Sequence, residues 1–335
     1  MANDCGPAIS IVIAAYDNNR LYDICELLKS INNEPEDNFE VICVIGKSKE
    51  LHGKINDFVK VNIAKKVKII LNMGDYRLNV QRNLGIEKAS SNIVAFVDDD
   101  AILMPNWINA VVKAFESPEV VGVTGPAVPL WESEDLNWLP REFWWITACT
   151  GWFDSTRSHE VRNAWGMNMA FRTSALKSVG GFNTCIGMRG KKGLVVGEVD
   201  LSLRIRELTE KKILFVPEMA VYHKVKAYRT SFSFIRQRSY SVGKGRVFIK
   251  KSFSGKEVGK SILNPEVNLL KRIFSRLVPE IILNLFTRPV KGLKQLVCTF
   301  TVLGFTGAGF AIASLHSSLR PDDFLSSAGK ISNSK

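Results

Sequence analysis

Cysteine is scarce in this sequence and never closely paired. The six cysteines are scattered, and no Cys-x-x-Cys spacing occurs. A fold held together by disulfides, or a zinc site built from paired cysteines, is therefore not expected. The chain also begins without the apolar stretch of a secretory signal. We accordingly expect a reduced protein on the cytoplasmic side of the membrane.

Acidic residues are almost missing from one long segment. Between Lys224 and Lys294 there are 17 Lys and Arg against three Glu, a net charge of +14, whereas the whole chain of 335 residues carries +12. This excess suits partners that carry phosphate: nucleic acid, anionic lipid headgroups or phosphorylated substrates. No base-reading motif accompanies the charge, so nucleic acid is not the expected partner.

The most informative stretch is an apolar run that ends in three carboxylates. Residues 93–97 predict a buried strand, and Asp98, Asp99 and Asp100 follow directly. A core does not accept three adjacent negative charges, so the chain must surface here and meet positive charge. Alternate side chains of an extended segment point the same way, so Asp98 and Asp100 can converge on a divalent cation while Asp99 faces elsewhere. The alternative is a solvated acidic turn.

Strand and helix patterns alternate through the first hundred residues. Apolar runs predict strands at 8–15, 39–45, 67–71 and 93–98, and helical spacing occurs at 21–31, near 52–59 and at 79–89. This order predicts an α/β sheet with right-handed crossovers. Ligands of such sheets bind at the carboxyl ends of the strands, where Tyr16-Asp17 and the three aspartates lie.

Three later stretches allow more than one interpretation. Residues 161–172 carry polar side chains between apolar ones and are interpreted as an edge strand, and the Gly- and Lys-rich residues 187–193 as a mobile lid. Residues 131–152 hold six large aromatic side chains. These indicate a substrate wall or a lipid-facing surface, with an ordinary core as the equal alternative.

The C-terminal part has features of a membrane-associated region. Residues 295–315 contain no charged side chain over 21 positions, long enough to cross a hydrocarbon layer of roughly 30 Å. Residues 269–286 alternate cations with apolar side chains, as an interfacial helix does. Cations ahead of the apolar segment favour the cytoplasmic membrane face for the preceding domain, attached peripherally or by one membrane segment. A buried helix pair is the alternative. We therefore predict one domain over 1–250 and a basic, helical region over 251–335.

Taken in order, several short motifs resemble family-2 nucleotide-sugar glycosyltransferases with the GT-A fold. The resemblance covers about residues 8–250. Its markers are residues 10–13 with Tyr16-Asp17, then 82–86, 98–100, 168–172, 180–183, 197–201 and 221–223. Residues 138–145 and 161–163 resemble more particularly the branch that contains glucosyl-dolichyl-phosphate glucuronosyltransferases. The resemblance implies a mainly parallel central sheet flanked by helices.

The resemblance also implies a reaction and a metal. A sugar would move from a nucleotide-diphosphate sugar to a lipid-linked acceptor, such as a polyprenyl or dolichyl phosphate, or to a cell-surface glycan. Asp98 and Asp100 would carry Mg²⁺ or Mn²⁺ against the diphosphate. His223 matches a late histidine that joins the metal or the diphosphate, and a purely structural histidine is the alternative.

Nucleotide binding is implied for five residues near the strand ends: Tyr16, Asp17, Arg82, Asp98 and Asp99. Arg82 would meet phosphate or the nucleotide, and a surface arginine is the alternative. Many relatives have an aspartate at the end of the second strand, where it contacts the base. This chain has Ile45 there, so its base must be held differently.

Glu198 lies where the family has its catalytic base. A carboxylate that deprotonates the acceptor hydroxyl would allow a single displacement with inversion at the anomeric carbon. Asp200 is the competitor for this role, and both residues also suit the first turn of a helix. The Gln-x-x-Arg-Trp motif of processive synthases is missing, so a polymer-extruding enzyme is not expected. The remaining alternatives are a soluble glycan or protein acceptor, and a non-catalytic nucleotide- or lipid-binding module.

Overall fold

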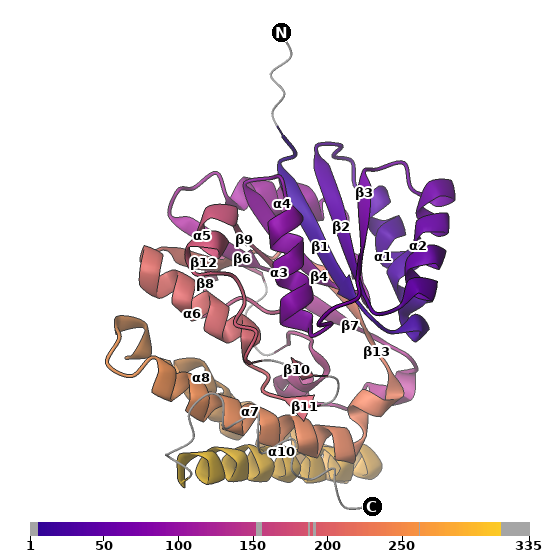
Figure 1. Ribbon diagram of the computed structural model, residues 1–335. Helices are drawn as coiled ribbons and strands as arrows, with labels where there is room; N and C mark the ends of the chain where they lie inside the picture. Colours follow the sequence, from indigo (N-terminus) through magenta and orange to yellow (C-terminus); the bar gives the residue numbers. More distant parts are fainter. Residues whose placement is uncertain (1–5, 152–155, 187, 190–191, 261, 316–335) are drawn as a thin grey trace, which may run out of the picture. The chain divides into compact units, whose positions relative to one another are not determined.

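The computed structural model of the chain describes residues 6–151, 156–186, 188–189, 192–260 and 262–315 (Figure 1). The chain divides into two compact units. Unit 1 comprises Met1–Ala127, Ser155–Gly190 and Gly197–His223, and unit 2 comprises Val128–Asp154, Lys191–Val196 and Lys224–Lys335.

An eight-stranded sheet forms the centre of unit 1, in the order β3-β2-β1-β4-β9-β6-β12-β8. The pairs β3/β2, β2/β1, β1/β4 and β6/β12 are parallel, whereas β9 is antiparallel to both of its neighbours. The strands are β1 (Ile9–Ala15), β2 (Phe39–Gly46), β3 (Val67–Asn72), β4 (Ile93–Asp98), β6 (Val120–Thr124), β8 (His159–Glu160), β9 (Asn168–Arg172) and β12 (Lys212–Phe215). The expected α/β sheet, mainly parallel, is confirmed.

Helices cover the sheet of unit 1. They are α1 (Leu21–Asn32), α2 (Lys49–Asn62), α3 (Leu78–Lys88), α4 (Trp107–Ala114), α5 (Thr173–Ser178) and α6 (Gly197–Thr209), with a 3₁₀ turn at Asn18–Arg20. Helix α3 packs on β1 and β2 (Figure 1). The approach is close because Gly85 has no side chain: a Cβ there would lie 2.3 Å from Val12 Cγ1.

Residues 161–172 do not form the expected edge strand. Strand β9 covers only Asn168–Arg172 and lies between β4 and β6 in the middle of the sheet. Asn168 is fully buried. Its amide nitrogen donates to the carbonyl oxygens of Pro126 and Met219, and its Oδ1 accepts from Trp107 Nε1 at 3.0 Å. The polar group is thus satisfied inside the core, so the polar–apolar alternation of residues 161–172 does not mark an edge strand.

Short strands bring a distant segment to the acidic triplet. Strand β5 (Ala101–Leu103) directly follows the triplet and pairs with the first residues of β13 (Val221–Val225), so that His223 lies opposite Ala101. The other short strands are β7 (Ala127–Trp131), β10 (Met188–Arg189) and β11 (Lys192–Gly193). Residues 187, 190 and 191 of the expected lid lie outside the described residues.

Unit 2 is mainly helical. Its helices are η2 (Glu134–Leu136), η3 (Arg141–Thr147), η4 (Ala227–Thr230), α7 (Phe232–Ser252), η5 (Glu257–Gly259), α8 (Asn264–Arg272), a π-helical turn (Ile273–Leu277), α9 (Val278–Thr287) and α10 (Pro289–Leu315). Trp131, Trp138, Trp144 and Trp145 pack against its hydrophobic cluster. These tryptophans therefore serve the core of unit 2, while Trp152 lies outside the described residues.

Candidate active site

The first and fourth strands end side by side. Strands β1 and β4 are parallel with Ala14 opposite Asp98, so the residues after β1 and the acidic triplet share one edge of the sheet. The Tyr16 side chain is 48% exposed at this edge, and its ring centroid lies 5.8 Å from that of Tyr76. Asp17 has a structural contact, because its carboxylate accepts from Asn19 N at 3.0 Å.

Three predicted ligands converge at this edge. Ligand atoms of Asp98, Asp100 and His223 lie within 4.8 Å of one another. His223 is fully buried, and its Nε2 lies 3.1 Å from Asp100 Oδ1. Two carboxylates and one imidazole form a donor set that fits a divalent cation such as Mn²⁺ or Mg²⁺, with the nitrogen ligand in favour of Mn²⁺.

Two arginines supply positive charge to the aspartates. Arg82 Nη2 donates to Asp98 Oδ1 at 2.9 Å and to the carbonyl oxygen of Gly166 at 2.7 Å. Arg82 is buried, so it is not a surface arginine. Arg20 Nη1 donates to Asp100 Oδ2 at 2.7 Å. The sequence reasoning missed Arg20, although its position just after β1 places it at the same edge of the sheet.

Asp99 is separate from the three converging residues. Its Oδ1 lies 4.0 Å from Arg20 Nε. Burial and the adjacent charge of Asp100 raise the pKa of Asp99 to about 8 despite this arginine. Asp99 is therefore set apart from Asp98, Asp100 and His223 by its surroundings, and its expected role in nucleotide binding stays a prediction.

The two candidate bases in the first turn of α6 have different surroundings. Asp200 is buried and accepts from Arg204 Nε at 2.8 Å, and Arg204 also donates to the carbonyl oxygens of Val179 and Gly181. Glu198 is only partly buried. Within the described part of the chain, its carboxylate forms no hydrogen bond or ion pair. Asp200 is thus committed to a structural pair and Glu198 is available for chemistry.

Gly166 connects Glu198 to the acidic triplet. A Cβ on Gly166 would lie 3.8 Å from Glu198 Cδ and 3.5 Å from both Nη atoms of Arg82. Arg82 in turn holds Asp98. The Glu198 carboxylate therefore lies close to the arginine that pairs with Asp98, and Gly166 lies between them.

Helix α3 fixes the segment that leads to Glu198. Asn79 Nδ2 donates to the carbonyl oxygens of Asn183 and Ile186, both at 2.9 Å. Asn83 exchanges two hydrogen bonds of 2.8 Å with the backbone of Phe182. Gly181 has a φ of +70°, which only glycine adopts readily, and a side chain there would meet Asn83. These contacts explain the asparagines of α3 and the Gly-Gly-Phe turn together.

A hollow lies beyond the ends of β2 and β3. It has a volume of about 290 Å³ and is lined by Lys47, Asp75, Tyr76 and Arg77. Lys47 Nζ lies 4.3 Å from the ring centroid of Tyr76. Ile45, by contrast, is fully buried in the core. The sequence reasoning overlooked these polar residues because they lie in loops, although strand ends are where they should have been sought.

A family comparison decides the class of the protein. Residues 10–180, about half of the chain, match the model of glycosyl transferase family 2. The chain belongs to glycosyl transferase family 2. The family expected from the motifs is thereby confirmed, and the matched residues include the acidic triplet and Arg82.

Sequence relatives agree with this assignment. The glycosyltransferase is 28% identical over 239 residues to a glucosyl-dolichyl phosphate glucuronosyltransferase of Haloferax volcanii, covering 70% of this chain and 75% of the relative. It is 31% identical over 108 residues to the putative glycosyltransferase EpsH of Bacillus subtilis, covering 32% and 30%.

Solved structures show the same fold. The mannosyltransferase PcManGT from Pyrobaculum calidifontis, in complex with GDP-Man and Mn²⁺, matches 99% of this chain and 82% of its own with a TM-score of 0.59 at 16% identity. GalNAc-T7 with UDP, GalNAc and Mn²⁺ matches 76% and 52% with a TM-score of 0.52 at 15% identity. The glycosyltransferase therefore has the expected GT-A fold.

Proposed function

We propose that this glycosyltransferase moves a sugar from a nucleotide-diphosphate sugar to a lipid-linked acceptor such as a polyprenyl or dolichyl phosphate, with inversion at the anomeric carbon. The observation that carries the proposal is the available carboxylate of Glu198 beside the Arg82–Asp98 pair. Sugar transfer needs a base for the acceptor and positive charge for the departing diphosphate, and the site offers both.

In this proposal the diphosphate lies against Asp98, Asp100 and His223. These residues would hold Mn²⁺ or Mg²⁺, which supplies positive charge to the diphosphate leaving group when bound. Arg20 orients the Asp100 carboxylate through its 2.7 Å contact, and Arg82 does the same for Asp98 at 2.9 Å. The two structural neighbours were solved with Mn²⁺ and with GDP-Man or UDP, which supports both the proposed cofactor and the proposed donor class.

Glu198 is the proposed general base. Its carboxylate would accept the proton of the acceptor hydroxyl while that oxygen attacks the anomeric carbon from the side opposite the diphosphate. Asp200 is proposed as a positioning residue, because its carboxylate already pairs with Arg204 at 2.8 Å. The start of α6 would then be held in register by this pair and by the asparagines of α3.

The nucleoside end of the donor is proposed to occupy the 290 Å³ hollow. Tyr16 and Tyr76 offer aromatic faces there, and Asp75 and Lys47 offer polar groups. Ile45 is buried in the core and cannot contact the base as the aspartate of many relatives does. Stacking of the base on a tyrosine ring and hydrogen bonds from the polar loop residues would take over this role. The Tyr16 and Asp17 backbone at the end of β1 would border the same nucleotide.

The lipid-linked acceptor and the membrane location rest on a relative and on one helix. The Haloferax protein is named for a dolichyl phosphate substrate. Pro289–Leu315 is the one helix within the described ranges that is long and apolar enough to cross a membrane. We propose that residues 1–250 act at the cytoplasmic membrane face and that residues 251–335 associate with the membrane.

A donor screen tests the proposed reaction. The full-length protein, a set of radiolabelled nucleotide sugars and extracted membrane lipids would be combined with Mn²⁺, with Mg²⁺ or with a chelator. The expected result is metal-dependent transfer from one donor into the lipid fraction, lost in Asp100→Asn. Transfer only to added soluble glycans or proteins would contradict the lipid-linked acceptor. Tight donor binding without transfer from any donor would contradict catalysis.

A further inference from the structure

Helix α10 of unit 2 buries small and polar residues and exposes large apolar ones, the opposite of a helix in a soluble protein. The residues that it buries are mostly small or polar: Gly292, Gln295, Cys298, Thr299, Val302, Gly309 and Ala313. The residues that it exposes are large and apolar: Val290, Leu293, Val297, Phe300, Phe305, Ile312 and Leu315. Of the 18 consecutive residues of α10 with the highest mean hydropathy, only 28% are buried. A core helix of a soluble protein would be mostly buried, so this helix presents its apolar side to something else.

The helical segments of unit 2 that precede α10 also expose large apolar side chains. Phe274, Ile282, Leu283 and Phe286 are 65%, 52%, 61% and 84% exposed. We call these four residues and the exposed residues of α10 the apolar face. So many exposed large apolar side chains in successive helices are unusual on a soluble monomer and indicate a membrane or a protein partner.

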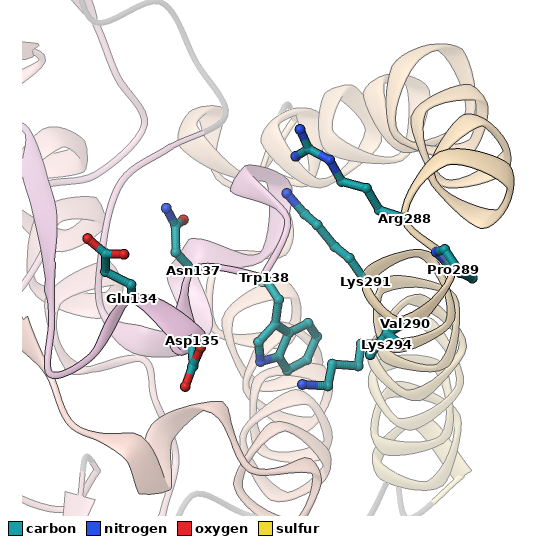
Figure 2. Close-up of a pocket in the computed structure, with 9 residues that line it drawn as sticks. All are labelled: Glu134, Asp135, Asn137, Trp138, Arg288, Pro289, Val290, Lys291 and Lys294. Atoms are coloured by element: carbon teal, nitrogen blue, oxygen red, sulfur yellow. The ribbon is translucent and has the colours of Figure 1, made fainter.

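A cationic pocket lies at the start of α10. Arg288, just before α10, and Lys291 and Lys294 in its first turns line this pocket together with Trp138 (Figure 2). The pocket has a volume of about 450 Å³, and Glu134 and Asp135 also line it. Among the residues that the structure describes, none of the three cations forms an ion pair. Three available cations beside an apolar face are complementary to the phosphates of a lipid surface.

The packing of α7 argues against a membrane-spanning α10. The two helices touch through glycine: a Cβ on Gly243 would lie 2.1 Å from the carbonyl oxygen of Thr306, and one on Gly309 would lie 2.3 Å from that of Tyr240. The guanidinium of Arg236 on α7 lies 5.8 Å from the ring of Phe305. Phe305 is the midpoint of residues 295–315, so spanning would bring Arg236 to the bilayer centre, where a charged side chain is strongly disfavoured.

We propose that unit 2 lies in the plane of an anionic membrane, with the apolar face at the headgroup–acyl boundary of the cytoplasmic leaflet and the Arg288–Lys291–Lys294 pocket on lipid phosphates. This inference deepens the proposed membrane location, which it presupposes, by defining the attachment as in-plane. In this orientation Arg236, beside the Phe305 ring at the edge of the apolar face, stays at the level of the lipid headgroups.

Vesicle sedimentation measures this attachment without any donor sugar. Full-length protein would be mixed with phosphatidylcholine vesicles with and without phosphatidylglycerol. We expect at least tenfold tighter binding to the anionic vesicles. Phe286→Glu/Phe300→Glu should weaken binding more than tenfold. Val61→Glu/Leu208→Glu, at apolar positions of unit 1 that are 83% and 58% exposed, adds the same charge and is the matched control. Both phenylalanines are largely exposed, so their replacement leaves the fold intact.

The pocket is tested by removing its charge. Arg288→Ala/Lys291→Ala/Lys294→Ala should weaken binding to anionic vesicles more than tenfold, because each cation near such a surface contributes roughly fivefold. Lys49→Ala/Lys60→Ala/Lys68→Ala removes the same charge from exposed positions of unit 1 and should retain most of the binding. An equal loss of vesicle binding in both triple variants would contradict the proposal that the pocket binds lipid phosphates. Dimerisation through the apolar face without vesicle binding would overturn the membrane as its partner.

Protease protection separates an in-plane helix from a spanning one. An epitope at the C-terminus would be probed in sealed inside-out membrane vesicles from cells that express the full chain. In-plane attachment leaves the epitope on the same side as unit 1, so protease removes it. An epitope that is protected until detergent is added would overturn the proposal. Because no sugar transfer is measured, this result is independent of the proposed reaction.

Discussion

Two carboxylates two positions apart in α6, Glu198 and Asp200, have different surroundings. Asp200 is buried against Arg204, whereas Glu198 is partly buried beside Gly166. Helical geometry explains the difference, because residues two apart point to different sides of a helix. Stability and activity should therefore respond to different members of this pair.

The stability of the two variants should differ clearly. Asp200→Asn should lower the free energy of unfolding by about 1–3 kcal/mol, because Arg204 loses its charged partner in a largely buried site. Glu198→Gln should stay within about 0.5 kcal/mol of the natural protein. Urea unfolding of both variants measures this. A large loss in Glu198→Gln alone would show that Glu198 has a structural role.

Glu40 provides a pH-dependent contribution to stability. Burial disfavours its charge, but hydrogen bonds from Ser10 Oγ, Ser90 Oγ and Ser90 N outweigh burial and lower the pKa of Glu40. A carboxyl whose pKa is lowered by folding stabilises the protein above its unfolded pKa, and this stabilisation is lost as the pH falls through the folded pKa.

Glu40→Gln should accordingly cost about 1–2 kcal/mol at pH 7. The difference from the natural protein should shrink below about pH 4, because the protonated carboxyl then resembles the amide. Urea unfolding at pH 7 and pH 3 provides the comparison. A difference that grows at low pH would contradict the assigned hydrogen bonds.

At the scale of elements, helix α3 links the core to the site. One side of it approaches β1 through Gly85, and its asparagines hold the turn and loop that precede Glu198. A shift of this helix would therefore move Arg82 and Glu198 together. Helix α2, by contrast, carries Gly53, and a Cβ added to this residue would meet no atom within 4 Å.

These two glycines should respond oppositely to alanine. Gly85→Ala should destabilise the protein by about 1–3 kcal/mol, because the added methyl group overlaps Val12. Gly53→Ala should stabilise it by about 0.5–1 kcal/mol through helix propensity. Thermal unfolding of the two variants is the measurement. Equal effects would mean that α3 does not pack on β1 as closely as described.

At the scale of the whole molecule, the sequence indicated the fold class and the local motifs but not every position. The strand ending at Asp98 was predictable because its apolar run is long and its end abruptly charged. Strand β9 was placed wrongly, since burial of Asn168 depends on partners from two distant segments. Asp100 contacts both Arg20 and His223. These contacts depend on which strands pair, and the hydrophobic periodicity of a single segment does not predict strand pairing.

Charge is also divided at this scale. The acidic triplet and its two arginines lie in unit 1, while the cation-rich segment from Lys224 to Lys294 lies in unit 2. This division fits the proposal, because one unit would perform transfer from a soluble donor and the other would meet a membrane that carries the acceptor.

The central claim is that Glu198 is the base of a metal-dependent sugar transfer. The most direct measurement is the transfer rate of Glu198→Gln and Asp200→Asn with the donor found by screening, alongside calorimetric donor binding. We predict that Glu198→Gln loses about 10²–10⁴-fold in rate while its donor affinity is retained. Asp200→Asn should keep transfer within about tenfold under conditions in which it is folded. Full transfer by Glu198→Gln together with its loss in Asp200→Asn would contradict the account.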